Sequence, residues 1–211
     1  MLTRRSLMGS ATALALFMGI AAPAFADPDA ALAKLQETVL SKGPSGEDPS
    51  PASDVVLSDE ELAKIKEMGA TAAIVMHYAG NDWSQAQING LQTQFAAMGI
   101  KVISVTDAGF KPEKQVSDLE TIMAQSPDII VSIPTDPTAT AAAYRAAAEA
   151  GAKLVFMDNV PTGFVPGTDY VSIVSADNYG NGVAAAHLMA KALGPDGGDI
   201  GLVFHAADFF V

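Results

Sequence analysis

The sequence predicts an α/β fold, in which a doubly wound parallel sheet is followed by the start of a second, similar lobe. Four apolar segments of strand length begin at residues 71, 101, 128 and 153, and helical stretches alternate with them. The starts lie 30, 27 and 25 residues apart, which is typical of successive βα units with parallel strands. The segments are continuous apolar runs, as a sheet covered by helices on both faces requires.

The first 26 residues have the features of an export signal. Arg4 and Arg5 precede an apolar stretch over residues 11–22, and Ala24-Phe25-Ala26 fits a cleavage site formed by small residues. The apolar stretch is too short to span a bilayer comfortably. The paired arginines fit either a general secretory signal or a twin-arginine signal. We therefore expect a mature protein in the periplasm, without a membrane anchor.

The mature chain is strongly acidic and has no cysteine. The full sequence has a formal net charge of −12, and cleavage after Ala26 removes two arginines, which gives the mature chain a charge of −14. An acidic surface repels phosphate backbones and anionic lipids, which argues against binding to nucleic acid or to a membrane surface. The lack of cysteine excludes disulfides, thiol chemistry and a lipid-modified cysteine.

Residues 27–57 are expected to be an N-terminal extension and linker. Residues 27–40 can form a short helix, whereas residues 41–54 are rich in proline, glycine, serine and acidic side chains and cannot pack a core. Ser58 and Glu61 then form a capping box, and Gly69 ends a helix over residues 59–68.

The first α/β lobe is expected to span residues 58–160. Gly99 and Gly151 stand where helices end, and Pro112 and Pro137 stand where helices begin. The expected strands cover residues 71–76, 101–106, 128–133 and 153–157, and the expected helices cover residues 83–98, 112–125 and 137–150. In open sheets of this kind, ligands bind at the carboxyl ends of the strands.

A change of pattern after residue 160 predicts a crossover and a second lobe. Residues 161–169 contain two prolines and two glycines and cannot form a helix. A strand over residues 170–175, a helix over residues 178–193 and a strand over residues 199–204 are expected next. Two strands and one helix cannot bury both faces of a sheet, so we expect residues 170–211 to be the beginning of an incomplete second lobe.

The sequence lacks the motifs of nucleotide cofactors and of common catalytic sites. Neither G-x-G-x-x-G nor G-x-x-x-x-G-K-[ST] follows the first strand or occurs elsewhere, and no G-x-S-x-G is present. His77, His187 and His205 lie far apart without acids or thiols at ligand spacing. We expect no catalytic residue, no metal and no cofactor.

Polar and aromatic side chains follow several of the expected strands. Because the carboxyl ends of parallel strands meet at one edge of a sheet, these side chains should lie together. Carboxylates and amides pair with vicinal hydroxyls, and an indole ring covers the apolar face of a sugar. The candidate ligand-binding residues are Asn81, Asp82, Trp83, Asp136, Asp158, Asn159, His205, Asp208 and Phe209. Helix capping is the alternative role for Asp82 and Asp136, whereas Asp158 and Asn159 precede no helix.

From residue 71 onward the chain resembles the type I periplasmic binding proteins of the ribose and galactose kind. The resemblance rests on the combination, in order, of Asn81-Asp82-Trp83, Lys111-Pro112-Glu113-Lys114-Gln115, Pro134-Thr135-Asp136, Met157-Asp158-Asn159 and Ser175-Ala176-Asp177-Asn178-Tyr179-Gly180-Asn181-Gly182. In that family two α/β lobes close on a monosaccharide or polyol, and the permease and ATPase of an importer accept the closed form.

The resemblance implies a sugar-binding protein of an ATP-binding-cassette importer, monomeric when complete. It implies that Asn81 and Trp83 supply a polar and aromatic pair after the first strand, and that Asp158 and Asn159 supply a ligand pair after the fourth. Second-lobe contacts would come from His205, Asp208 and Phe209.

Three other functions are open to the sequence to different degrees. The effector-binding core of a gene repressor would need a DNA-binding helix-turn-helix and a basic face, which this acidic chain does not offer. A sugar sensor for a membrane receptor would use the same two-lobed form, and the sequence does not separate sensing from transport. A small α/β hydrolase or isomerase would reveal itself by turnover of a bound sugar.

Export should remove residues 1–26, because the small-residue site ends at Ala26. Mass spectrometry of the periplasmic fraction is expected to find a chain that begins at Asp27. Replacing Arg4 and Arg5 with lysine should abolish export only if the twin-arginine route is used. A periplasmic protein that still carries the apolar stretch would contradict the prediction.

Overall fold

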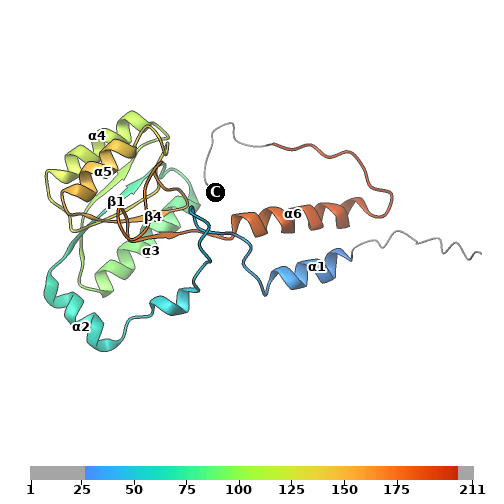
Figure 1. The fold of residues 1–211 in the computed structure, drawn as a ribbon, viewed down its shortest axis with the longest axis horizontal. Coiled ribbons are helices and arrows are strands. Elements are labelled where there is room, and N and C mark those ends of the chain that lie inside the picture. The colour runs from blue at the N-terminus through green and yellow to red at the C-terminus, as the bar shows by residue number, and fades with distance from the viewer. Residues whose placement is uncertain (1–26, 204–211) are drawn as a thin grey trace, which may run out of the picture.

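The computed structural model describes residues 27–203 and contains a parallel sheet of five strands. The strands are β1 (Thr71–Met76), β2 (Lys101–Asp107), β3 (Ile129–Ser132), β4 (Lys153–Met157) and β5 (Ser172–Val174). Their order in the sheet is β2-β1-β3-β4-β5, so β3 is the middle strand and β1, β3 and β4 are interior. The predicted α/β architecture is therefore confirmed (Figure 1).

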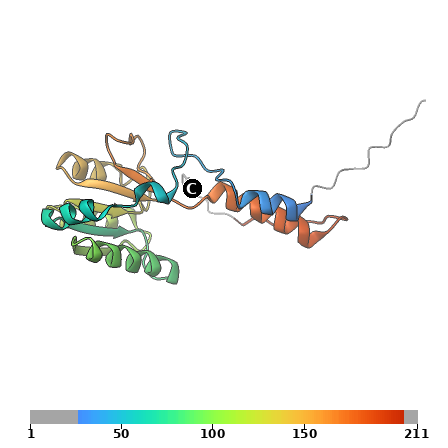
Figure 2. The same cartoon turned by 90° about the horizontal axis from the view of Figure 1, so that it is seen from below.

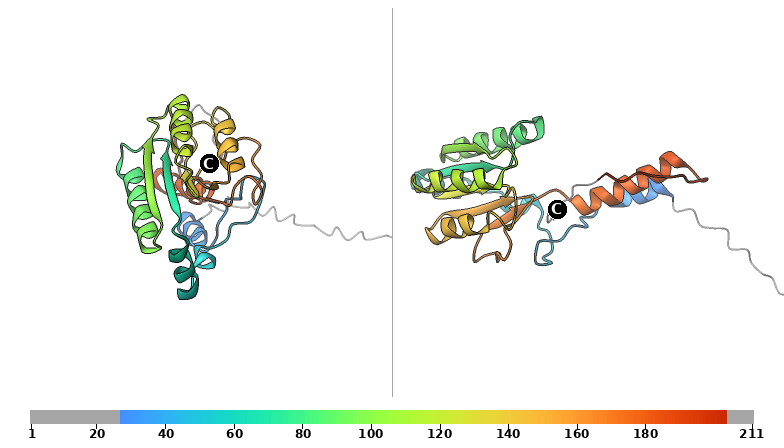
Figure 3. Two further views of the ribbon diagram at one scale, coloured as in Figure 1. Left: turned by 90° about the vertical axis from the view of Figure 1, so that its left-hand side faces the viewer. Right: turned by 90° about the horizontal axis from the view of Figure 1, so that it is seen from above.

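Helices cover both faces of the sheet. The helix α3 (Asp82–Ala97) packs on one face, and α4 (Pro112–Met123) and α5 (Ala141–Glu149) pack on the other (Figure 3, left). The side chains of β1 alternate between the two layers: Ala73 and Val75 join the core beneath α4 and α5, whereas Ile74 and Met76 join the core beneath α3. Because alternate side chains enter different cores, β1 must be a continuous apolar run.

Side-chain caps fix the beginnings of the helices. The expected capping box opens α2 (Asp59–Met68), in which Ser58 and Glu61 satisfy each other's backbone N–H groups. Gly69 follows the helix in the left-handed conformation, as expected. The third helix begins at Asp82 rather than at Trp83, because Asn81 provides the cap.

The start of α5 at Ala141 differs from the expected start at Pro137. The carboxylate of Asp136 accepts hydrogen bonds from the backbone N–H groups of Thr138 and Ala139, each at 2.8 Å. The hydroxyl of Thr140 donates to the carbonyl of Asp136 at 2.6 Å. These bonds stabilise a separate turn over residues 136–140, which the proline alone did not reveal.

The strand expected to open a second sheet lies instead at the edge of the first one. The residues of β5 pair in parallel with Val155, Phe156 and Met157 of β4. Burial explains this placement, since Tyr170 enters the core against the ring of Phe156 at 5.5 Å. Residues 199–203, also expected to be in a strand, have no strand structure.

Two helices lie apart from the sheet. These are α1 (Pro28–Leu35) and α6 (Asn178–Leu193), which lie side by side (Figures 1 and 2). A short 3₁₀ turn (Ala52–Val55) lies between α1 and α2. None of the helices within residues 27–203 has both the length and the apolar character needed to cross a membrane.

A buried glutamine connects α4 to the carboxyl end of β3. The side chain of Gln115 is fully buried, and its amide donates to the carbonyl of Ile133 at 2.8 Å. Its amide oxygen accepts the backbone N–H of Thr135 at 2.7 Å. One side chain thus satisfies two buried backbone groups and fixes the loop that follows β3.

Replacing Gln115 with leucine should preserve volume but leave these two backbone groups without partners. Each unsatisfied buried group costs about 1–3 kcal/mol, so the free energy of unfolding should fall by about 2–4 kcal/mol. Urea denaturation measures the change. The control is Gln92→Leu on the exposed side of α3, expected to change stability by less than about 0.5 kcal/mol. Equal losses in both variants would contradict the assigned role of Gln115.

Candidate ligand-binding site

Two carboxylates lie near enough to a histidine at the carboxyl edge of the sheet to influence its pKa. His77 follows β1, Asp107 ends β2 and Asp158 follows β4. Burial lowers the pKa of His77 below its ordinary value of 6.5, while the nearby carboxylates of Asp158 and Asp107 act to raise it. The desolvation effect is the larger one, so the imidazole is held in its neutral form more strongly than in water.

Aromatic rings line the same edge beside this histidine. The ring of Phe110 stacks on that of Tyr78, with centroids 4.7 Å apart, and its edge meets the ring of His77 at 5.1 Å. Trp83 lies edge-on to His77 at 6.3 Å. We call Tyr78, Phe110, His77 and Trp83 the aromatic ridge. Trp83 and Phe110 are 52% and 58% exposed, so the ridge offers ring surface to a ligand.

Phe110 is one of the residues that sequence reasoning missed. Its φ of 59° is unusual for a bulky side chain, and its backbone N–H donates to the carbonyl of His77 at 2.8 Å. Tyr78, Asp107 and a binding role for His77 were also missed. The available signal was their position directly at or after the ends of β1 and β2.

Asp158 lies at the point where β4 and β5 end. Its backbone has a φ of 58°, and its N–H donates to the carbonyl of Val174 at 3.0 Å. Its carboxylate accepts the hydroxyl of Ser175 at 3.1 Å. The side chain is partly exposed, so the carboxylate is held in place and still has room to accept further hydrogen bonds.

Asn159 turns the other way, into the protein. It is 4% exposed, and its amide approaches the carbonyl of Pro134 at 3.5 Å, a long distance for a hydrogen bond. The pair Asp158-Asn159, nominated together, is thus divided between a position at the edge and a buried position.

Two of the nominated residues are engaged in caps or turns. The side-chain oxygen of Asn81 accepts the N–H of Ser84 at 2.8 Å and caps α3, the role that had been considered for Asp82. Asp82 is instead an exposed residue of the first turn of α3. Asp136 accepts the N–H groups of its own turn, as described above. The nominated residues His205, Asp208 and Phe209 lie outside the described part of the chain.

Four buried side-chain atoms within residues 27–203 have no hydrogen-bond partner, and two of them belong to the loops that follow β1 and β3. These two are Nδ1 of His77 and the hydroxyl of Thr135, a residue that is 8% exposed. Buried polar groups are normally paired, so these two atoms have unused hydrogen-bonding capacity. Within residues 27–203 there is no group of three or more histidine, aspartate or glutamate side chains that could hold a metal ion.

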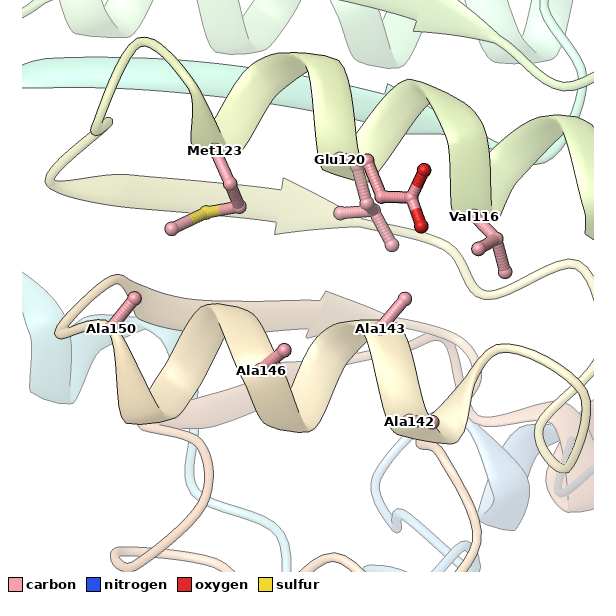
Figure 4. A pocket seen from close by; sticks show the side chains of 8 residues that line it. Val116, Glu120, Met123, Ala142, Ala143, Ala146 and Ala150 are labelled. Atoms are coloured by element: carbon pink, nitrogen blue, oxygen red, sulfur yellow. The ribbon is translucent and has the colours of Figure 1, made fainter.

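A pocket elsewhere on the lobe has different chemistry. It measures about 410 Å³ and lies between α4 and α5 (Figure 4). Its lining is formed by Val116, Leu119, Glu120, Met123, Ala142, Ala143, Ala146 and Ala150. With one carboxylate among alanine and other apolar side chains, this pocket lacks the polar groups that orient a small ligand.

A family model described as "Periplasmic binding protein domain" matches residues 72–209. The match begins within β1 and includes the whole sheet and α6. No curated protein matches the chain.

Solved structures of binding proteins resemble this chain. The Caulobacter myo-inositol binding protein bound to myo-inositol is 27% identical, with a TM-score of 0.52 over 59% of this chain and 40% of that chain. A solute-binding protein from Agrobacterium vitis, bound with α-D-tagatopyranose, is 27% identical with a TM-score of 0.53 over 59% and 44%. An arabinose binding protein from Geobacillus stearothermophilus is 27% identical with a TM-score of 0.52 over 59% and 41%. The chain thus spans about two fifths of the length of these proteins.

The pKa of His77 should respond to the two carboxylates beside it. Asp158→Asn should lower this pKa further, because the imidazolium loses an attractive charge.

The native pKa of His77 is below its unfolded value, so the free energy of unfolding should fall as the pH drops below 6.5, until the native His77 is also protonated. NMR titration of the imidazole measures the pKa. Asp54→Asn, an exposed change in the linker, is the control and should leave it unchanged. An identical His77 pKa in wild type and Asp158→Asn would contradict the prediction.

Proposed function

The chain belongs to the periplasmic binding protein domain family, and we propose that it captures a monosaccharide or sugar alcohol and delivers it to the permease of an ATP-binding-cassette importer. The family consists of solute-binding proteins, so the proposed activity is capture without turnover. The relatives support this ligand class, because the 27%-identical solved structures are a protein bound to myo-inositol, one bound with α-D-tagatopyranose and an arabinose binding protein.

The observation that carries the proposal is that the carboxylates of Asp158 and Asp107 lie near His77, which is part of the aromatic ridge. Carboxylates accept hydrogen bonds from vicinal hydroxyls, and a neutral imidazole can donate one and accept another. The exposed ring surface of Trp83 and Phe110 suits the apolar C–H face of a sugar. One edge of the sheet therefore presents both kinds of surface that a polyhydroxylated ligand needs.

Some of the side chains that we propose as ligand contacts are accessible, whereas others already make hydrogen bonds within the protein. Asp158 and Trp83 are the principal ones, because both are accessible at the edge. Asn81 and Asp136 would have to serve the ligand in addition to their capping bonds. The further proposed contacts are Asp82, Asn159, His205, Asp208 and Phe209.

The proposed location is the periplasm, reached through a signal over residues 1–26. The basic start and the small-residue site of that segment support export, and the family supports the compartment. Delivery to a permease requires the ligand-bound form to be recognised at the membrane. Binding of the mature protein to vesicles that contain the permease, with and without sugar, would test that step separately.

Asp158→Asn should weaken sugar binding at least about tenfold, because a hydrogen bond to a charged group is worth about 1.5–3 kcal/mol. Asparagine is the suitable replacement, since it tolerates the positive φ at this position better than alanine does. A thermal-shift screen with pentoses, hexoses and polyols identifies the ligand, since saturation at about 100 times Kd adds about 2.7 kcal/mol of stability. Calorimetry then compares the affinities.

The matched control is Asp196→Asn, which removes the same charge from an exposed turn after α6. It should leave the affinity unchanged. Unchanged affinity in a correctly folded Asp158→Asn would remove Asp158 from the site. Conversion of the bound sugar into a product would replace the proposed binding function with an enzymatic one.

A further inference from the structure

The helices α1 and α6 form a unit that two chain segments join to the sheet. Within residues 27–203, each of these helices contacts the other and no other helix or strand. The views agree that the pair extends away from the sheet (Figures 2 and 3). Residues 36–58 form the first connection, and residues 175–177 form the second, between β5 and α6. The position of α6 therefore depends on these two connections.

A single carboxylate ties the two connections together. Asp177 accepts the backbone N–H of Leu40 on one oxygen, at 2.9 Å. Its other oxygen accepts the backbone N–H and the hydroxyl of Ser41, at 2.9 and 2.8 Å. That oxygen also accepts the N–H of Gly180 at 2.9 Å and so caps α6. We call these four hydrogen bonds the Asp177 clasp.

Neighbouring residues complete the arrangement. The hydroxyl of Ser41 accepts the N–H of Tyr179 at 3.2 Å, which adds a bond from α6 to the first connection. A Cβ at position 180 would collide with the carboxylate of Asp177, so glycine provides the space that the clasp occupies. The hydrogen bonds, that of the Leu40 N–H first among them, lower the pKa of Asp177 to about 2. The clasp is therefore charged at any ordinary pH.

The extension is paired with α6 on one side of the clasp and forms its own turn on the other side. On one side, the carboxylate of Asp29 in α1 pairs with the ammonium group of Lys191 in α6. Both side chains are exposed, so this pair contributes little by itself. On the other side, residues 43–47 form a turn closed by a bond from the N–H of Gly43 to the carbonyl of Glu47, at 2.8 Å. The extension thus contacts α6 before the clasp and forms a hydrogen-bonded turn after it.

We propose that residues 27–41 are a strap, and that the Asp177 clasp holds it on the second connection and restricts the movement of α6 relative to the sheet. A single connection can rotate about its backbone dihedrals. Two connections that are hydrogen-bonded to each other must move together, because rotation of either one breaks bonds to a charged group. The restriction arises from chain geometry and needs no ligand.

The clasp lies close to the candidate site along the chain. Ser175, whose hydroxyl donates to Asp158, precedes Asp177 by two residues on the second connection. Asn178 donates to the same hydroxyl at 3.1 Å. A strap that steadies this connection therefore also steadies the hydrogen-bond partner of Asp158.

Asp177→Asn separates the clasp from the helix cap. The amide oxygen can still accept the N–H groups of Gly180 and Ser41, which share one oxygen in the native clasp, but the amide NH₂ meets the N–H of Leu40, donor against donor. Hydrogen exchange at Leu40 should become about tenfold faster or more, because this amide loses its acceptor, whereas exchange at Ser41 should increase less, because its acceptor only loses its charge. The native chain contains no cysteine, so spin labels can be placed at Gln92→Cys on α3 and Ala186→Cys on α6, both exposed. The distribution of label distances should broaden in Asp177→Asn.

Ser41→Ala removes the hydroxyl bonds to Asp177 and Tyr179 but leaves the Asp177–Gly180 cap bond in place, and it should shift both measurements in the same direction by a smaller amount. Asp196→Asn removes an equal charge outside the clasp and should change neither measurement. Unchanged exchange at Leu40 and Ser41 in both clasp variants would show that the strap is not held by Asp177. Faster exchange with an unchanged distance distribution would show that the clasp forms but does not restrict α6. Neither outcome depends on the sugar-binding proposal.

Discussion

Strand β1 is buried on both faces, and the positions of the other elements follow from this burial. Its residues from Ala72 to Met76 have no exposed surface, so each side chain must be apolar and must belong to one of the two cores. With β2 and β3 paired on its two edges, the strand has no polar surface along its length. His77 is the first polar side chain after it, at the carboxyl edge of the sheet. The polar site begins where the buried strand ends.

The electrostatics of this edge result from a competition between burial and charge. Two carboxylates would favour an imidazolium, yet the desolvation of His77 outweighs them and its pKa is lowered. The edge therefore combines charged acceptors with a neutral ring that can donate and accept. Hydroxyl groups need this mixture, because each hydroxyl is both a donor and an acceptor. A charged imidazolium would offer donors alone.

Local signals made most of the lobe predictable. The bounds of β1, β4 and α6 agree with those expected, because apolar runs and caps mark them within a few residues. The pairing of β5 was not predictable, since three residues carry little pattern and the partner was decided by the burial of Tyr170. For the site, Asp158 and Trp83 were found as polar or aromatic residues at strand ends. The stacking of Phe110 on Tyr78 was not predicted, because it depends on a positive φ at Phe110 and phenylalanine is not a residue type that indicates a positive φ.

The ionisable groups at the edge and at the clasp respond to different ranges of pH. The native pKa of Asp177 is below its ordinary value of 3.8, so its contribution to stability is fully present above that value and is lost as the pH falls through about 2. The native pKa of His77 is also lowered, but for a base the sign is reversed, and mild acid favours the unfolded state. As the pH falls below 6.5, the clasp therefore keeps its charge while the folded state loses the contribution of neutral His77 to its stability. The attachment of α6 is therefore insensitive to the acidity that affects the ligand edge, although Ser175 and Asp177 lie on the same short connection.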